Sequence, residues 1–175
     1  GGAAGEYALA LSGSTAAPPT NISLGQGMSV SLSWNTTDDM NLEVRDPVGG
    51  AVNFRTPAVD SGGRLTNNVN ATCVNTTNDN PTETISWPRG NVPGGSYEII
   101  VYFNQACPAN PTAGSAATAD AAGLPASNSG TVNFALTVTV DGNTLEPIRG
   151  SLNANQQYVA SFIVLAADKV SLQSG

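Results

Sequence analysis

The chain contains no histidine, and this absence removes several kinds of chemistry. Triad hydrolases depend on a histidine base, and many zinc sites use imidazole ligands. Two carboxylate pairs for glycoside hydrolysis stay open, because the sequence does not give their separation: Glu83 with Glu98, and Asp39 with Asp46. Carboxylates on strand faces are usually solvated, so we expect a protein that is not an enzyme.

Charged residues are also scarce, at 11% of the chain. Six Lys and Arg residues stand against thirteen Asp and Glu, which gives a formal net charge of −7, and the cations are scattered singly. An acidic chain without a basic patch is a poor partner for nucleic acid or an anionic membrane. No apolar stretch approaches the roughly 18 to 20 residues of a membrane-spanning helix. We therefore expect neither nucleic-acid binding nor membrane insertion.

Cysteine occurs only twice, as Cys73 and Cys107 in loop-like sequence, and no CxxC motif is present. We interpret the pair as a disulfide formed in an oxidising compartment, with two separate buried thiols as the alternative. The chain begins at Gly1 without Met, as a mature exported chain does. Together these features predict a secreted protein, extracellular or on the cell surface.

What the sequence does contain is period-2 alternation of apolar and polar residues, which is typical of half-buried strands. The pattern is strongest in 28–34, 97–103, 132–140 and 158–164, and the last of these is apolar on its second face as well, which predicts a central or doubly covered strand. Weaker strands are expected over 6–11, 41–45, 51–54, 144–149 and 169–172. No helical period of useful length appears. The sequence predicts an all-β fold, a single jelly-roll-like antiparallel β-sandwich of about nine or ten strands.

Turn residues separate these strands. Asp141-Gly142 lies between two strand patterns and predicts a tight hairpin. Residues 1–20 form an N-terminal strand and a Pro-rich tether, and residues 21–175 form the sandwich domain with a long loop over 108–130. Trp34 and Trp87 lie in register with apolar faces, which favours the core over a sugar-stacking platform.

Several of these segments also carry the pattern of a known family. Asp39 to Gly49 combine an Asp-rich strand with an Asp-Pro turn, and Gly62-Gly63-Arg64-Leu65 precede Asn67, Asn68, Asn70 and Cys73. A more specific run follows, which consists of Pro81, Glu83, Ile85, Trp87, Pro88, Gly90, Pro93, Gly95 and Tyr97. The pattern then ends with Tyr102, Phe103 and Cys107. From about Trp34 to Phe162 the chain resembles the bacterial YfaP-like secreted domain, a β-sandwich related in appearance to pre-peptidase C-terminal domains. Asn41, Thr66 and Asn68 stand where that family has Asp, and Glu43 where it has His. The resemblance implies the fold rather than an activity.

A calcium ion is the strongest metal hypothesis, although no cofactor is required by the sequence. Oxygen-bearing side chains bracket one strand and the polar segment after it, and the set we expect to bind calcium is Asp39, Asn41, Asp46 and Asn67. The alternative is that these residues hydrogen-bond to nearby backbone in turns.

The N-terminal strand is amphipathic, with Tyr7, Leu9 and Leu11 on one side. One interpretation is an edge strand of its own sheet. The other is a strand donated to a neighbouring copy, which repeated head to tail builds a filament. The leading functional hypothesis is a secreted structural subunit of an extracellular or cell-surface filament, with itself as partner. The alternative is a monomeric, calcium-assisted module that binds carbohydrate, such as a surface glycan, or protein.

Overall fold

A computed structural model describes residues 6–12, 20–23, 27–76, 80–108 and 130–164. These residues form twelve strands, three of them only two residues long, and one short 3₁₀ turn, η1 (Ala71–Cys73). The strands are β1 (Glu6–Ser12), β2 (Thr20–Ser23), β3 (Met28–Trp34), β4 (Asp39–Arg45), β5 (Ala51–Val52), β6 (Arg64–Leu65), β7 (Thr82–Trp87), β8 (Gly95–Gln105), β9 (Thr131–Val140), β10 (Asn143–Thr144), β11 (Ile148–Asn153) and β12 (Gln157–Val164). In the described part of the chain, no helix has the length and apolar character needed to cross a membrane.

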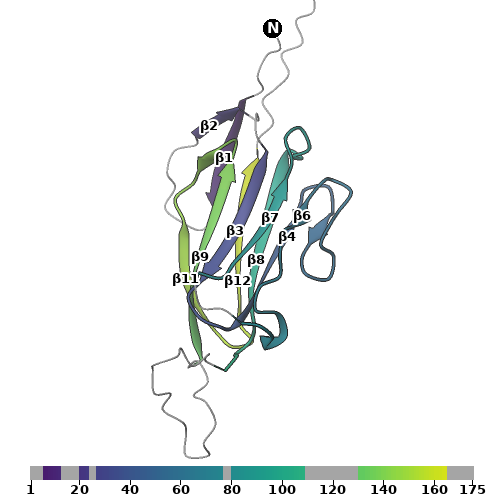
Figure 1. Ribbon diagram of the computed structural model, residues 1–175. Helices are drawn as coiled ribbons and strands as arrows, with labels where there is room; N and C mark the ends of the chain where they lie inside the picture. Colours follow the sequence, from purple (N-terminus) through teal and green to yellow (C-terminus); the bar gives the residue numbers. More distant parts are fainter. Residues whose placement is uncertain (1–5, 13–19, 24–26, 77–79, 109–129, 165–175) are drawn as a thin grey trace, which may run out of the picture.

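The strands form two antiparallel sheets that pack face to face, so the predicted all-β sandwich is confirmed (Figure 1). Sheet A has the order β2-β1-β12-β8-β4-β5. Sheet B has the order β10-β9-β3-β7-β6, and β11 also pairs with β9. The jelly-roll connection pattern stays a prediction.

The core lies between the sheets and follows the alternation in the sequence. In β3, Met28, Val30, Leu32 and Trp34 are buried while the serines between them are partly exposed. Trp34 and Trp87 are 3% and 1% exposed, so both belong to the core, as their register indicates. The ring of Tyr97 lies parallel to the ring of Phe162, with centroids 5.0 Å apart.

The Asp-Gly hairpin is confirmed. Asp141 and Gly142 have φ angles of 52° and 79°, and Asn143 of β10 pairs with Val140 of β9. Positive φ at both central residues is the geometry of a tight two-residue hairpin turn, which Asp and Gly tolerate better than other residues.

The strand expected over 144–149 is wrong in its bounds, because the structure has β10 at Asn143–Thr144 and β11 at Ile148–Asn153. Gly150, the residue that follows the expected strand, pairs with Phe134 inside β11. A Cβ at Gly150 would lie 2.7 Å from the Phe134 ring, so glycine is required there by packing rather than by a turn.

β12 is central in sheet A, between β1 and β8, as predicted. Its outer face is not fully covered by the described residues, since Val159 and Ile163 are 49% and 40% exposed. The strand expected over 169–172 and most of the loop over 108–130 lie outside the described residues.

Candidate functional site

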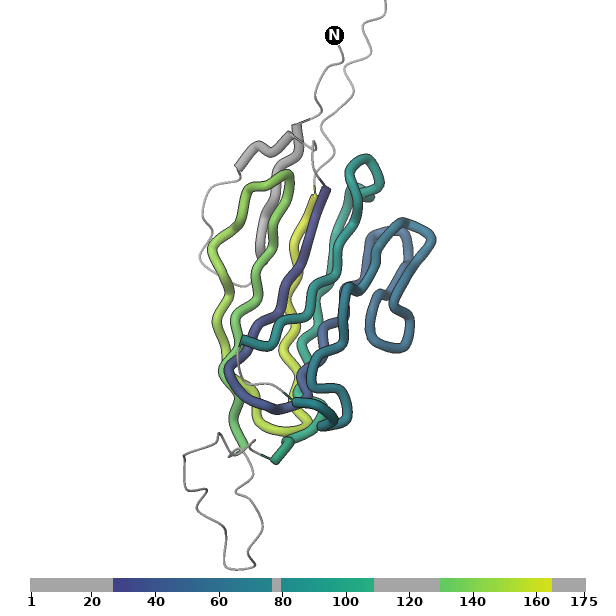
Figure 2. The backbone as a smooth tube through the Cα atoms, in the orientation of Figure 1, coloured from purple at the N-terminus to yellow at the C-terminus, as the bar shows by residue number. Residues whose placement is uncertain are grey.

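A groove crosses the outer face of sheet A at right angles to its strands. The register places Asn41 of β4 and Gln157 of β12 on either side of Tyr102 of β8, so the three residues form one row on one face. The segment after β5, residues 53–55, and the turn before β12, residues 155–156, also line the groove, and the turn is hydrogen-bonded to Phe103 of β8. Figure 2 shows the segment between β5 and β6 standing out from the side of the sandwich.

The groove has a volume of about 350 Å³, within the range of roughly 300–1,000 Å³ that is typical of small-ligand sites. Amide side chains make up half of its twelve lining residues. The lining consists of Asn41, Leu42, Glu43, Asn53, Phe54, Arg55, Tyr102, Phe103, Asn104, Asn155, Gln156 and Gln157. An amide offers two donors and an acceptor, so such a lining suits a ligand rich in hydroxyl groups.

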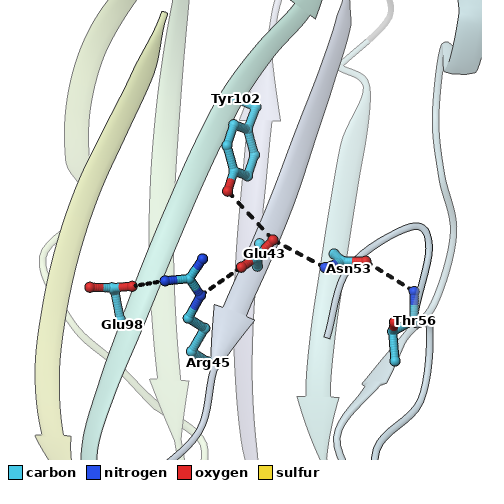
Figure 3. Close-up of polar contacts among 6 residues, drawn as sticks. All are labelled: Glu43, Arg45, Asn53, Thr56, Glu98 and Tyr102. Atoms are coloured by element: carbon cyan, nitrogen blue, oxygen red, sulfur yellow. Dashed lines mark hydrogen bonds and ion pairs between the residues drawn. The ribbon is translucent and has the colours of Figure 1, made fainter. Parts of the chain in front are cut away.

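Glu43 lies at the centre of a hydrogen-bond network beside the groove (Figure 3). Its Oε1 accepts from Arg45 Nε at 2.7 Å, and its Oε2 accepts from Asn53 Nδ2 at 3.0 Å. The hydroxyl of Tyr102 donates to the same Oε2 over a long 3.5 Å. Arg45 Nη1 also donates to Glu98 at 2.8 Å. Because the Glu43 side chain is only 11% exposed, these partners replace the water that its carboxylate has lost.

The pKa is raised in two members of the network, Arg45 and Tyr102. The hydrogen bond that Arg45 donates to Glu43, and the negative charge of Glu43, raise the pKa of Arg45, so the guanidinium stays protonated. Burial, and then the charge of Glu43, raise the pKa of Tyr102, so its hydroxyl keeps the proton that it donates.

Phe54 stands at the tip of a tight turn at one end of the groove. The Asn53 side-chain oxygen accepts from the backbone N–H groups of Arg55 and Thr56, each at 2.9 Å, and Asn53 N donates to Thr56 O at 3.1 Å. Such side-chain bonds stabilise a turn locally. The Phe54 ring is 41% exposed, and the Arg55 guanidinium lies 5.1 Å from its centroid.

The residues expected to bind calcium are not brought together as one set. Asn41 donates to Asp39 Oδ1 at 3.1 Å, so these two are in contact. Asp46 follows the opposite end of β4, about 23 Å from Asp39 at the usual rise per strand residue, and Asn67 donates to Thr82 O at 3.0 Å. No group of three or more His, Cys, Asp or Glu side chains suited to a metal ion occurs in the ranges that the structure describes.

The aspartates instead bind backbone and side-chain donors. Asp39 Oδ2 accepts from Thr72 N at 3.1 Å and from Asn104 Nδ2 at 2.9 Å. Asp46 Oδ1 accepts from Val48 N at 3.0 Å and Gly50 N at 2.7 Å. Asp46 therefore follows the turn-forming alternative that the sequence left open, whereas Asp39 binds donors that are distant in the sequence.

The predicted disulfide between Cys73 and Cys107 is confirmed, with an S–S distance of 2.04 Å and Cα atoms 5.3 Å apart. It joins η1 to the segment after β8. Asp38 Oδ1 also accepts from Cys107 N at 2.8 Å, so the same end of the sandwich is held by two different interactions.

In the single chain, β1 pairs with β12 of its own sheet. Leu9 is opposite Val164 and Leu11 is opposite Phe162, while Tyr7 is opposite Ile22 of β2. These three residues are the ones expected to take part in assembly. Whether a neighbouring copy supplies the same strand stays a prediction.

Comparison with known proteins found no matching family model, no similar curated protein and no similar solved structure. The resemblance to the YfaP-like secreted domain therefore stays a prediction. Sequence reasoning did not find Phe54, Tyr102 or Gln157 as site residues. The sequence signal for this site was the run of amide side chains over 153–157. These side chains become part of a site because the register places the start of β12 beside β8.

Proposed function

We propose that the protein is a secreted binding module that holds carbohydrate in the groove across β4, β8 and β12. The observation that carries this proposal is the row of Asn41, Tyr102 and Gln157 on the outer face of sheet A, within a groove lined by six amide side chains. Hydroxyl-rich ligands need many paired donors and acceptors, and side chains projecting from a sheet supply them in fixed positions. The disulfide is consistent with an oxidising exterior, where surface glycans occur.

Electrophoresis through gels that contain soluble neutral or acidic polysaccharides tests the proposal. We expect at least one polysaccharide to retard the chain. Gln157→Ala removes an exposed groove amide and is expected to reduce this retardation, whereas Asn133→Ala removes an exposed amide from sheet B and serves as the matched control. Equal retardation of the two variants, or no retardation by any polysaccharide, would overturn the proposal. Retention by an immobilised protein alone would point to a protein ligand instead.

A second candidate function is the structural one, a filament subunit assembled by exchange of β1. It is favoured by the position of β1, which reaches β12 through only four paired residues, Leu9–Ser12 against Ser161–Val164. A neighbouring copy that presents the same strand would make the same main-chain hydrogen bonds. Because the exchanged contact is heterologous, it would continue from copy to copy.

Negative-stain electron microscopy of the full chain, beside a chain that lacks residues 1–20, tests this candidate. Filaments that are present in the first sample and absent from the second would support it. Discrete particles in both samples would reject it and leave the binding module.

A further inference from the structure

We infer that the groove selects an uncharged glycan and that a sugar ring of this ligand stacks on Phe54. The inference rests on the proposed function, because it names the ligand class and the main apolar contact of the same groove.

Three of the four charged side chains in or beside the groove are paired with one another, and Arg55 forms no ion pair within the described residues. Only Glu43 and Arg55 are charged among the lining residues. Glu43 forms an ion pair with Arg45, which in turn pairs with Glu98, and the Arg55 guanidinium lies against the Phe54 ring. An acidic glycan would find no free pair of cations in this lining and would meet a chain of net charge −7. An uncharged ligand does not meet that repulsion.

The amides nearest the open side of the groove are available to a ligand. The side chains of Asn155 and Gln157 are exposed and form no hydrogen bond within the described part of the chain. Asn41 and Asn104 each donate to Asp39 through Nδ2, which fixes the orientation of both amides. The amides of Asn41 and Asn104, which form the floor of the groove, are therefore held in place. Asn155 and Gln157, on the side near β12, offer free donors and acceptors.

Phe54 supplies the apolar surface that a sugar ring requires. Phe54 is 41% exposed, and it belongs neither to the core cluster nor to the partly buried hydrophobic residues packed against that cluster. The Asn53 side chain binds the two following backbone N–H groups, so the turn is held and little conformational entropy is lost when a ligand binds. An aromatic ring beside fixed polar groups is the usual composition of a small-ligand site.

A glycan array that carries both neutral and acidic glycans tests the inference, followed by calorimetry with the glycan that binds best. We expect binding to neutral glycans only. Phe54→Ala is expected to weaken the affinity about tenfold, and Phe54→Tyr, which keeps the ring, is expected to retain most of it. The matched control is Val48→Ala, because Val48 is 68% exposed and lies outside the groove lining. All three variants should unfold at the temperature of the parent chain, since neither side chain belongs to the core.

The outcomes separate the inference from the proposed function. Binding to acidic glycans only, or neutral-glycan binding that Phe54→Ala leaves unchanged, would overturn the inference and leave the groove as a carbohydrate site. Binding to no glycan of either kind would overturn the proposed function itself.

Discussion

Glu83 is a buried carboxyl group that joins the two sheets. It is fully buried in β7 of sheet B, and its two oxygens accept from Leu42 N of β4 at 2.9 Å and from Val69 N at 3.2 Å. β5 pairs only with the end of β4, at Val44 and Arg45, so Glu83 provides the acceptor that a longer neighbouring strand would have given to Leu42. Burial raises the pKa of Glu83 to about 8, and the two N–H groups offset part of that rise.

This carboxyl group predicts that stability falls as the pH rises. In the folded chain Glu83 holds its proton up to about pH 8, whereas in the unfolded chain it loses it near pH 4.5. Its contribution is therefore fully present below pH 4.5 and is lost as the pH rises through 8. We expect the free energy of unfolding, measured with urea, to fall between pH 5 and 8 in the parent chain.

Glu83→Gln provides the comparison for this pH dependence. The variant cannot titrate, so its stability should change less over the same range. The free energy of unfolding of the variant at pH 5 should also be lower by about 1–3 kcal/mol. The NH₂ group that replaces one carboxyl oxygen cannot accept the hydrogen bond from the backbone N–H that faces it. If the parent chain and the variant show equal pH slopes, another group accounts for the dependence.

The buried aspartates predict that the fold does not need calcium. Asp46 accepts from Val48 N, Gly50 N and the hydroxyl of Ser61, so its oxygens are occupied by the protein. Addition of EDTA is expected to leave the melting temperature unchanged, whereas Asp46→Ala should cost about 1–3 kcal/mol by leaving these donors unpaired. Asp60→Ala, at an exposed aspartate in the following loop, is the control. A melting temperature that rises with added calcium would contradict this expectation and return the metal hypothesis to Asp39, Asn41, Asp46 and Asn67.

At the scale of elements, the strands could be predicted because each carries its own pattern. Alternation in 28–34 and 132–140 fixes which residues point inward, and Asp141-Gly142 specifies its own turn. The bounds of β11 could not be predicted in the same way. Gly150 is explained only by the Phe134 ring on the strand beside it, and that contact is invisible until the pairing of β9 with β11 is known.

The groove could not be predicted for the same reason. Asn41, Tyr102 and Gln157 are far apart in the sequence and become neighbours only through the register of three strands.

The calcium hypothesis was reasonable locally, because Asp39 and Asp46 flank a short segment. In a strand, however, residues seven apart lie at opposite ends. Asp46 accepts from donors in its own turn, and Asp39 accepts from Thr72 N, which is distant in the sequence.

The disulfide provides a prediction for one end of the sandwich. Cys73 and Cys107 are 34 residues apart, and closing a loop of this length contributes on the order of 3–4 kcal/mol in the chain-entropy model. We expect replacement of both cysteines by serine to lower the free energy of unfolding by about that amount, measured with urea under oxidising conditions. The parent chain in a reducing buffer should behave like the variant. An unchanged unfolding midpoint would show that Asp38 and Asp39 already hold this end without the covalent bond.

At the scale of the whole molecule, the question is whether β1 is an integral strand or an exchangeable one. A core cluster extends from Met28 to Val164 and draws on both sheets. The groove lining lies between Asn41 and Gln157. A chain that lacks residues 1–20 is therefore expected to fold, to unfold cooperatively and to bind glycan with unchanged affinity. It loses the four residue pairs between β1 and β12, so its melting temperature should fall on the order of 5–10 °C.

A peptide with the sequence of Glu6–Ser12 then tests exchange directly. If the edge of β12 accepts a strand from outside the chain, the peptide should bind the shortened chain and raise its melting temperature toward that of the full chain, in proportion to peptide concentration. A peptide of the same composition in scrambled order should have no effect, because the alternate residues would no longer match Phe162 and Val164. If the native-order peptide does no more than the scrambled one, β1 is an integral strand of its own sheet and the filament hypothesis fails. Recovery with the native order alone would establish that the edge accepts β1 from a second molecule, which is the step that assembly requires.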